Sequence, residues 1–146
     1  MCLLMSWTTS ATELATSFVN VFVFNVPLGT PRRVEDSAGK GLMLYNKGDD
    51  PLSIHVEAVF PSAKELRSPA EPVPDTRWIQ IQPENIEVPA HGRAEVQVII
   101  LVPNDKKYRS HLYQAMISSR AQSLAGQGVI LSAGLKSRLT FKVADH

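Results

Sequence analysis

Hydrophobic and polar residues alternate along several stretches of this chain, a spacing that places every second side chain on the same face of a β-strand. The clearest stretch is 135–143, where one predicted face carries Leu135, Ser137, Leu139, Phe141 and Val143. The residues between them are Lys136, Arg138, Thr140 and Lys142, which predict a solvated, basic opposite face. The stretch 94–102 alternates in its first half and is apolar at every position from Val98 on. It predicts a strand with one face in the core, whose second half is covered on both faces or meets a partner.

Shorter stretches predict further strands, at 42–46, 54–60, 78–82, 86–88 and 112–117. Turn-forming residues separate them, as in the Asn-Lys-Gly-Asp-Asp-Pro run that follows the first of these strands. Because that run is short, 42–46 and 54–60 are predicted to pair as a hairpin. No amphipathic helix of useful length is indicated anywhere in the chain.

The stretch 18–26 is β-branched or aromatic at nearly every position, which predicts a strand without a single solvated face. Such a strand either lies between two covered surfaces, switches between sheets, or pairs with another molecule by adding to that molecule's β-structure. Pairing within the chain is the favoured interpretation. The stretch 61–75, with four prolines, predicts a loop that crosses between sheets.

The 146 residues suggest one domain with a substantial core, here assigned to 18–146. Residues 1–17 are predicted to be a flexible or loosely packed terminal segment, with the alternative that Met1 is not the true start and a signal peptide precedes it. The formal net charge is only +1 and no basic block occurs, so nucleic acid is not an expected partner. No apolar run approaches the roughly 20 residues of a membrane span.

Motifs that carry chemistry were sought and not found. The four histidines, His55, His91, His111 and His146, have no second ligand at metal-site spacing. The glycines form no phosphate-binding loop, no serine lies in a nucleophile elbow, and the single cysteine, Cys2, allows no internal disulfide. The sequence therefore predicts a protein that is not an enzyme and has no cofactor and no metal.

Five segments in this order resemble a known family: Leu42–Gly48 with Pro51-Leu52, Trp78–Pro83, Ile86–Gly92, Val102–Asp105 with Tyr108 and Tyr113, and Gly134–Phe141. The order resembles bacterial immunoglobulin-like domains of exported and surface proteins. These are similar in layout to the amino-terminal domain of periplasmic pilus chaperones and to major-sperm-protein-like domains. Over about 18–143, the resemblance implies an all-β, immunoglobulin-like Greek-key β-sandwich of about seven strands.

The resemblance and the lack of catalytic motifs together predict a non-catalytic protein-binding or structural subunit of an extracytoplasmic assembly, in the periplasm or at the cell surface. A cytoplasmic location is the alternative. Contact with protein partners, including self-association, is expected through exposed strand edges. The residues expected to make these contacts are Phe18, Val19, Val21, Phe22, Val23, Phe24, Leu135, Leu139, Phe141 and Val143.

Two other functions are compatible with this fold. One is a chaperone that lends a strand to exported subunits, for which 135–143 is the candidate strand, although the paired basic residues of pilus chaperones cannot be placed here. The other is a carbohydrate-binding accessory domain, in which Trp78 and Tyr45 would stack on sugar rings. Trp78 is instead expected in the core, because such a sandwich needs a large buried aromatic residue.

Overall fold

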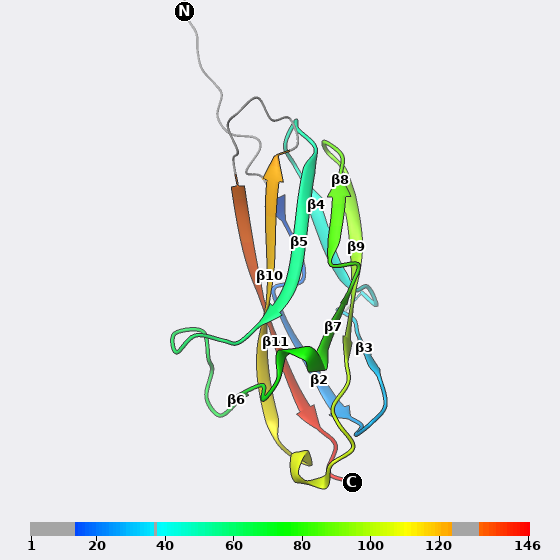
Figure 1. Ribbon diagram of the computed structural model, residues 1–146, viewed down its shortest axis with the longest axis vertical. Coiled ribbons are helices and arrows are strands. Elements are labelled where there is room, and N and C mark those ends of the chain that lie inside the picture. Colours follow the sequence, from blue (N-terminus) through cyan, green and yellow to red (C-terminus); the bar gives the residue numbers. More distant parts are fainter. Residues whose placement is uncertain (1–13, 37, 124–131) are drawn as a thin grey trace, which may run out of the picture.

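The computed structural model describes residues 14–36, 38–123 and 132–146, and in it two β-sheets pack face to face along an elongated molecule (Figure 1). The all-β sandwich predicted from the alternating pattern is confirmed. The segments 1–13 and 124–131, which include Cys2, lie outside the described residues.

The first sheet is built around β9 (Arg93–Ile100). On one side, β4 (Leu42–Asn46) pairs with the first half of β9 and β3 (Arg32–Val34) with its second half. On the other side β7 (Ile79–Gln82) pairs with the second half, and β1 (Leu14–Ala15) adds to β4. β3 and β4 lie one after the other along the same side of β9. They are in effect one strand whose pairing with β9 is interrupted at 35–41.

The second sheet has the long hairpin of β10 (Leu112–Ser123) and β11 (Ser132–Val143) at its centre. Beyond β10 lie β5 (Leu52–Val59) and then β8 (Asn85–Val88). Beyond β11 lies β2 (Asn20–Val26), which pairs with it in parallel. All other long pairings in the two sheets are antiparallel.

The predicted hairpin between 42–46 and 54–60 is wrong, because β4 belongs to the first sheet and β5 to the second. The turn between them instead carries the chain from one sheet to the other, as in a Greek-key arrangement. A period-two pattern identifies strands and their faces, but it contains no information about which strand is the neighbour.

Asn46 stabilises this crossing. Its side chain is buried, and Nδ2 donates to the backbone carbonyls of Asp50 at 2.7 Å, Val88 at 3.2 Å and Pro89 at 3.1 Å. Its Oδ1 accepts from the Gly48 N–H at 3.0 Å. Since Asn46 ends a strand of the first sheet and Val88 ends a strand of the second, one amide side chain joins the two sheets at this end of the sandwich.

Residues just before position 18 also pack into the sandwich. Leu14 is buried and pairs with Asn46, and the Thr16 hydroxyl donates to the carbonyl of Met43. Residues 14–17 therefore belong to the sandwich, although they fall within the segment 1–17 that was predicted to be loosely packed. The two-residue β1, the short β3 and the two-residue β6 (Glu71–Pro72) were not predicted, and they raise the number of described strands above the expected seven.

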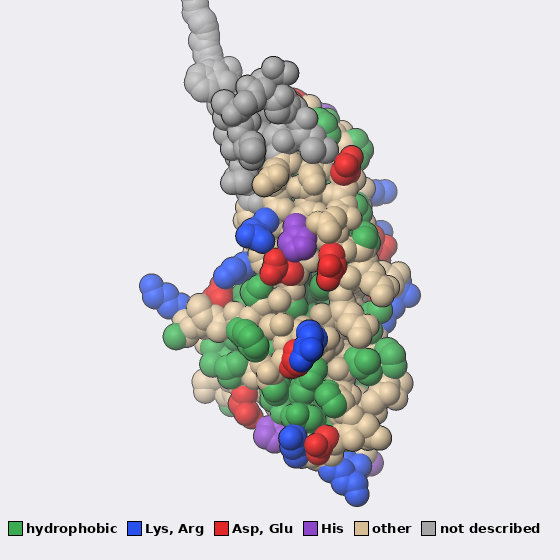
Figure 2. Space-filling model, in the orientation of Figure 1, with side chains coloured by type: hydrophobic (Ala, Val, Ile, Leu, Met, Phe, Trp, Pro, Cys, Tyr) green, Lys and Arg blue, Asp and Glu red, His purple; other side chains and the backbone are tan. Residues whose placement is uncertain are grey.

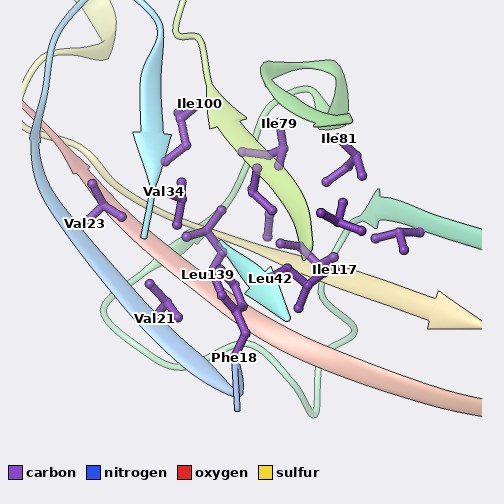
Figure 3. Close-up of a cluster of buried hydrophobic side chains, with 14 of the residues drawn as sticks. Phe18, Val21, Val23, Val34, Leu42, Ile79, Ile81, Ile100, Ile117 and Leu139 are labelled. Atoms are coloured by element: carbon purple, nitrogen blue, oxygen red, sulfur yellow. The ribbon is translucent and has the colours of Figure 1, made fainter. Parts of the chain in front are cut away.

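The core lies between the two sheets, and its side chains come from the inner face of nearly every strand (Figure 3). Figure 3 shows Val21, Val23 and Leu139 of the second sheet pointing toward Val34 and Ile100 of the first. All five are at most 9% exposed. The predicted inner face of β11 is confirmed, because Ser137, Leu139, Phe141 and Val143 are buried and Leu135 packs against the core.

The predicted crossing loop at 61–75 is also confirmed, and part of it lies on the outer face of the second sheet. Gln114 of β10 is fully buried beneath it, donates to the carbonyl of Glu65 at 2.8 Å and accepts from the Arg67 N–H at 2.8 Å. Lys136 of β11 forms an ion pair with the Glu65 carboxylate at 3.1 Å. Further on, β6 extends the sheet by pairing with β10.

Three aromatic rings fill the end of the core near the C-terminus. Trp78, at the end of a 3₁₀ turn (Thr76–Trp78), is 6% exposed and packs edge to face against Tyr108 and Tyr113, with ring centroids 4.7 and 5.6 Å apart. This confirms the expected core position of Trp78. Burial, with the nearby Glu71 carboxylate, raises the pKa of Tyr113 to about 12.

Replacing Asn46 with Ala is expected to lower the free energy of unfolding by about 2–3 kcal/mol, because it leaves buried backbone groups without partners. Urea denaturation measures this loss. Asn20→Ala, at an exposed asparagine, is the matched control and is expected to change stability by no more than about 0.5 kcal/mol. Equal effects of the two substitutions would show that Asn46 does not join the sheets.

The raised pKa of Tyr113 makes folding sensitive to alkaline pH. A tyrosine in the unfolded chain ionises near pH 10, whereas Tyr113 in the folded chain stays neutral up to about pH 12. Its contribution to stability is therefore complete below pH 10 and is lost as pH rises from there toward 12. The difference in ultraviolet titration between wild type and Tyr113→Phe should have its midpoint near 12. A midpoint near 10 in protein still folded by circular dichroism would contradict the buried position.

Candidate functional site

The strand β2 lies at the edge of the second sheet, where β11 is its only partner among the described strands. The Arg138 N–H donates to the carbonyl of Val19 at 2.8 Å, which fixes the direction of the backbone groups of β2. Successive residues of a strand direct these groups to opposite edges, so the backbone N–H and C=O groups of Val19, Val21 and Val23 face β11. The N–H and C=O groups of Asn20 and Phe22 face away from the sheet and form its free edge.

This free edge ends at Asn25. Its φ of 57° interrupts the extended backbone, so that Val26, three residues after Val23, again points into the core. Beside it, Arg32 Nη1 donates to the carbonyls of Phe24 at 3.3 Å and Asn25 at 3.5 Å. Arg32 thus reaches from the first sheet to the second and occupies the carbonyls of Phe24 and Asn25, which leaves the backbone groups of Asn20 and Phe22 as the open part of the edge.

The side chains of β2 alternate between core and solvent. Val21 and Val23 are buried, whereas Val19 is 58%, Phe22 56% and Phe24 57% exposed. The two phenylalanine rings stack on each other, with centroids 6.2 Å apart. Exposed apolar side chains and free backbone N–H and C=O groups therefore occur on the same strand.

A shallow groove runs along the open edge between β2 and the segment 32–36 of the opposite sheet (in Figure 1, β2 lies between β11 and β3). Glu35 and Asp36 line it beside Asn20 and Phe22, and at the Phe24 and Asn25 end Arg32 and Arg33 join the same two carboxylates. The Asn20 end is therefore lined by acidic side chains alone, and the basic side chains lie only toward the Phe24 end. Nothing in the sequence of 32–36 indicated that it belongs to a site, because only the fold places this segment beside β2.

Six of the ten residues predicted to make protein contacts have buried side chains: Phe18, Val21, Val23, Leu139, Phe141 and Val143. They belong to the core. Leu135 is half-buried and packs against the core, and only Val19, Phe22 and Phe24 present apolar side chains to solvent. The sequence identified the correct strand for an exposed edge, but it did not separate the residues that bury their side chains from those that expose them.

The strand at 135–143 is not the open edge that the sequence suggested. Over Arg138–Val143, β11 is paired on one side with β10 and on the other with β2. Lending this part of β11 to another protein would require β2 to leave the sheet. Among the described residues, only Ser132–Ser137 of β11 lacks pairing on the β2 side.

The predicted pair of sugar-stacking aromatics is not assembled. Trp78 is buried among Tyr108 and Tyr113, so its face is not available to a sugar ring. Tyr45 is half-buried and lines a shallow pocket with His91 and Arg93 at the other end of the sandwich. Two aromatic rings at opposite ends cannot form one platform.

Charged side chains are spread over the surface in pairs of opposite sign, and Figure 2 shows both signs interspersed on one face. Three histidines each lie within 3.1 Å of a carboxylate oxygen: His55 with Glu57, His91 with Asp49, and His111 with Glu71. Within the described ranges, no three His, Cys, Asp or Glu side chains are grouped as metal ligands. The same ranges contain no helix long and apolar enough to cross a membrane.

Comparison with solved structures shows what this fold is similar to. A PapD-like (ASH) domain of human CEP192 superposes with a TM-score of 0.68 at 12% identity, over 100% of this chain and 95% of that domain. A chain of the Salmonella enterica SafA pilin–SafB chaperone complex has a TM-score of 0.60 at 13% identity, over 93% of this chain and 57% of the other. The periplasmic chaperone SfaE has a TM-score of 0.58 at 12% identity, with 90% and 58% covered.

The chain therefore has the immunoglobulin-like sandwich of PapD-like domains, and the predicted resemblance is confirmed. It spans somewhat more than half of the two chains from the chaperone structures. No protein-family model and no curated protein sequence matches it.

The exposed rings of β2 should contribute little to folding. Phe22→Thr and Phe24→Thr are each expected to change the free energy of unfolding by no more than about 1 kcal/mol, because only a surface stacking contact is lost. Phe141→Ala, at a fully buried ring, is expected to lose about 3–5 kcal/mol. Urea denaturation compares the three variants. A loss at Phe22 or Phe24 as large as that at Phe141 would show that these rings support the fold and are not available to a partner.

Proposed function

We propose that this chain is a non-catalytic protein-binding subunit of an extracytoplasmic assembly, and that it binds by adding a strand of its partner to the free edge of β2. The observation that carries the proposal is the coincidence of unpaired backbone groups at Asn20 and Phe22 with exposed rings at Phe22 and Phe24. Strand addition obtains affinity from main-chain hydrogen bonds and specificity from alternate side chains, and β2 offers both.

The composition of β2 supports this role. Natural proteins usually protect an edge strand with lysine, proline or an inward charge. From Asn20 to Val26 this strand has none of these, and the protection begins only at Asn25 and Arg32. An apolar edge that stays open over its first part is suited to a partner strand.

Among the similar structures are a pilin–chaperone complex and a periplasmic chaperone, which support placing the proposed assembly in the periplasm or at the cell surface. The strand-lending role is the weaker proposal, since β2 already covers the part of β11 that includes Leu139, Phe141 and Val143.

The proposal is tested by placing a proline at the outward-facing position of β2. Proline at residue 22 removes only an N–H that points away from β11, so Phe22→Pro should fold while its free edge is blocked. Phe22→Thr is the matched control, because it removes the ring and keeps the N–H.

Each tagged variant is used to capture partners from the protein's own source, and native mass spectrometry gives the stoichiometry. We expect wild type to recover a defined complex, Phe22→Thr to recover less of it, and Phe22→Pro to recover none. Equal recovery by a folded Phe22→Pro variant would place the binding site elsewhere.

A further inference from the structure

We infer that a second copy of this chain occupies the free edge of β2, with the two β2 strands antiparallel about a two-fold axis. This assignment rests on the binding role proposed above for β2 and names the partner. It is carried by the order of charges along the groove, where Glu35 and Asp36 are the only charged residues at the Asn20 end and Arg32 and Arg33 are added toward the Phe24 end.

The backbone of β2 fits such a pairing. In an antiparallel pair with Phe22 on the two-fold axis, Phe22 lies opposite Phe22 of the second copy, and Asn20 lies opposite Phe24. The N–H and C=O groups of Asn20 and Phe22 point away from β11 and can exchange hydrogen bonds across the axis, whereas Phe24 offers its N–H and its C=O is held by Arg32. The six-stranded sheets of the two copies would then join into one continuous sheet.

The charges favour the antiparallel arrangement over a parallel one. Two-fold symmetry makes every contact occur twice, with residue i against j and j against i. The basic end of each groove therefore meets the acidic end of the other, whereas a parallel arrangement would bring like ends together. The self-complementary order of charges is what identifies a second copy as the occupant.

Arg33 and Glu35 are the charges available for this contact. Both are exposed, and neither forms an ion pair with another described residue. Arg32 is engaged with the carbonyls of Phe24 and Asn25, and the Asp36 carboxylate accepts from backbone N–H groups of the following turn. Arg33 of each copy would thus lie toward Glu35 of the other.

The side chains of β2 are also self-complementary. The strand from Asn20 to Val26 has no charged residue, so pairing it with itself opposes no like charges. Phe22 and Phe24 project from the same face of the sheet. In the pair, the two Phe22 rings become cross-strand neighbours with a Phe24 ring on either side, which covers part of the exposed surface of four rings.

The test is a pair of charge reversals, Arg33→Glu and Glu35→Arg, followed by sedimentation and by native mass spectrometry of an isotope-labelled mixture. Wild type should dimerise, and each single reversal should weaken its homodimer about tenfold or more, because both symmetric contacts become repulsive. Mixing the two variants should give a heterodimer in preference to either homodimer, since both contacts are then attractive. The double variant Arg33→Glu with Glu35→Arg should dimerise like wild type.

The outcomes separate this inference from the proposed function. A wild-type dimer that persists in a folded Phe22→Pro variant, or a mixture with no preference for the heterodimer, overturns the inference. A chain that stays monomeric at its highest soluble concentration also overturns it. In that case the proposed function still stands if a different partner binds wild type and not Phe22→Pro, and it fails if no binding depends on Phe22.

Discussion

The pairing of β11 on both of its sides is the interaction on which the rest of this structure depends. Its long ladder with β10 forms the centre of the second sheet, and its inner face supplies Leu139, Phe141 and Val143 to the core. Its parallel pairing with β2 closes the other side. This second pairing also makes β2 the edge of the sheet, so the surface that is open to a partner follows directly from how the last strand of the core is covered.

The alternating pattern was sufficient to predict the fold class and most strands, because a half-buried strand displays its inner face in the sequence. The pattern did not predict which strands pair with each other. The residues of β4 and β5 look like the two arms of a hairpin, yet Asn46 and the turn that follows it send the chain to the opposite sheet. The short β1 and β3 were missed because two or three residues are too few to show a period.

The candidate site shows the same limit more sharply. An apolar run at 18–26 indicated a strand with more hydrophobic surface than one buried face requires, and the structure accounts for the excess in Val19, Phe22 and Phe24. The charged residues at 32–36 carry no pattern of their own. They become part of the groove only because the turn after β2 brings the chain back along the same edge in the opposite sheet, which is a property of the topology.

The left-handed backbone of Asn25 has a consequence for any strand that adds to β2. An added strand can continue its hydrogen bonds only as long as β2 stays extended. Asn25 therefore limits how many backbone hydrogen bonds the added strand can form. The number of these hydrogen bonds in turn sets how long an added strand stays bound, because all of them must break before the two strands separate. Asparagine tolerates this conformation better than most residues, and the position is therefore one at which a substitution would change the lifetime of the proposed complex without altering the core.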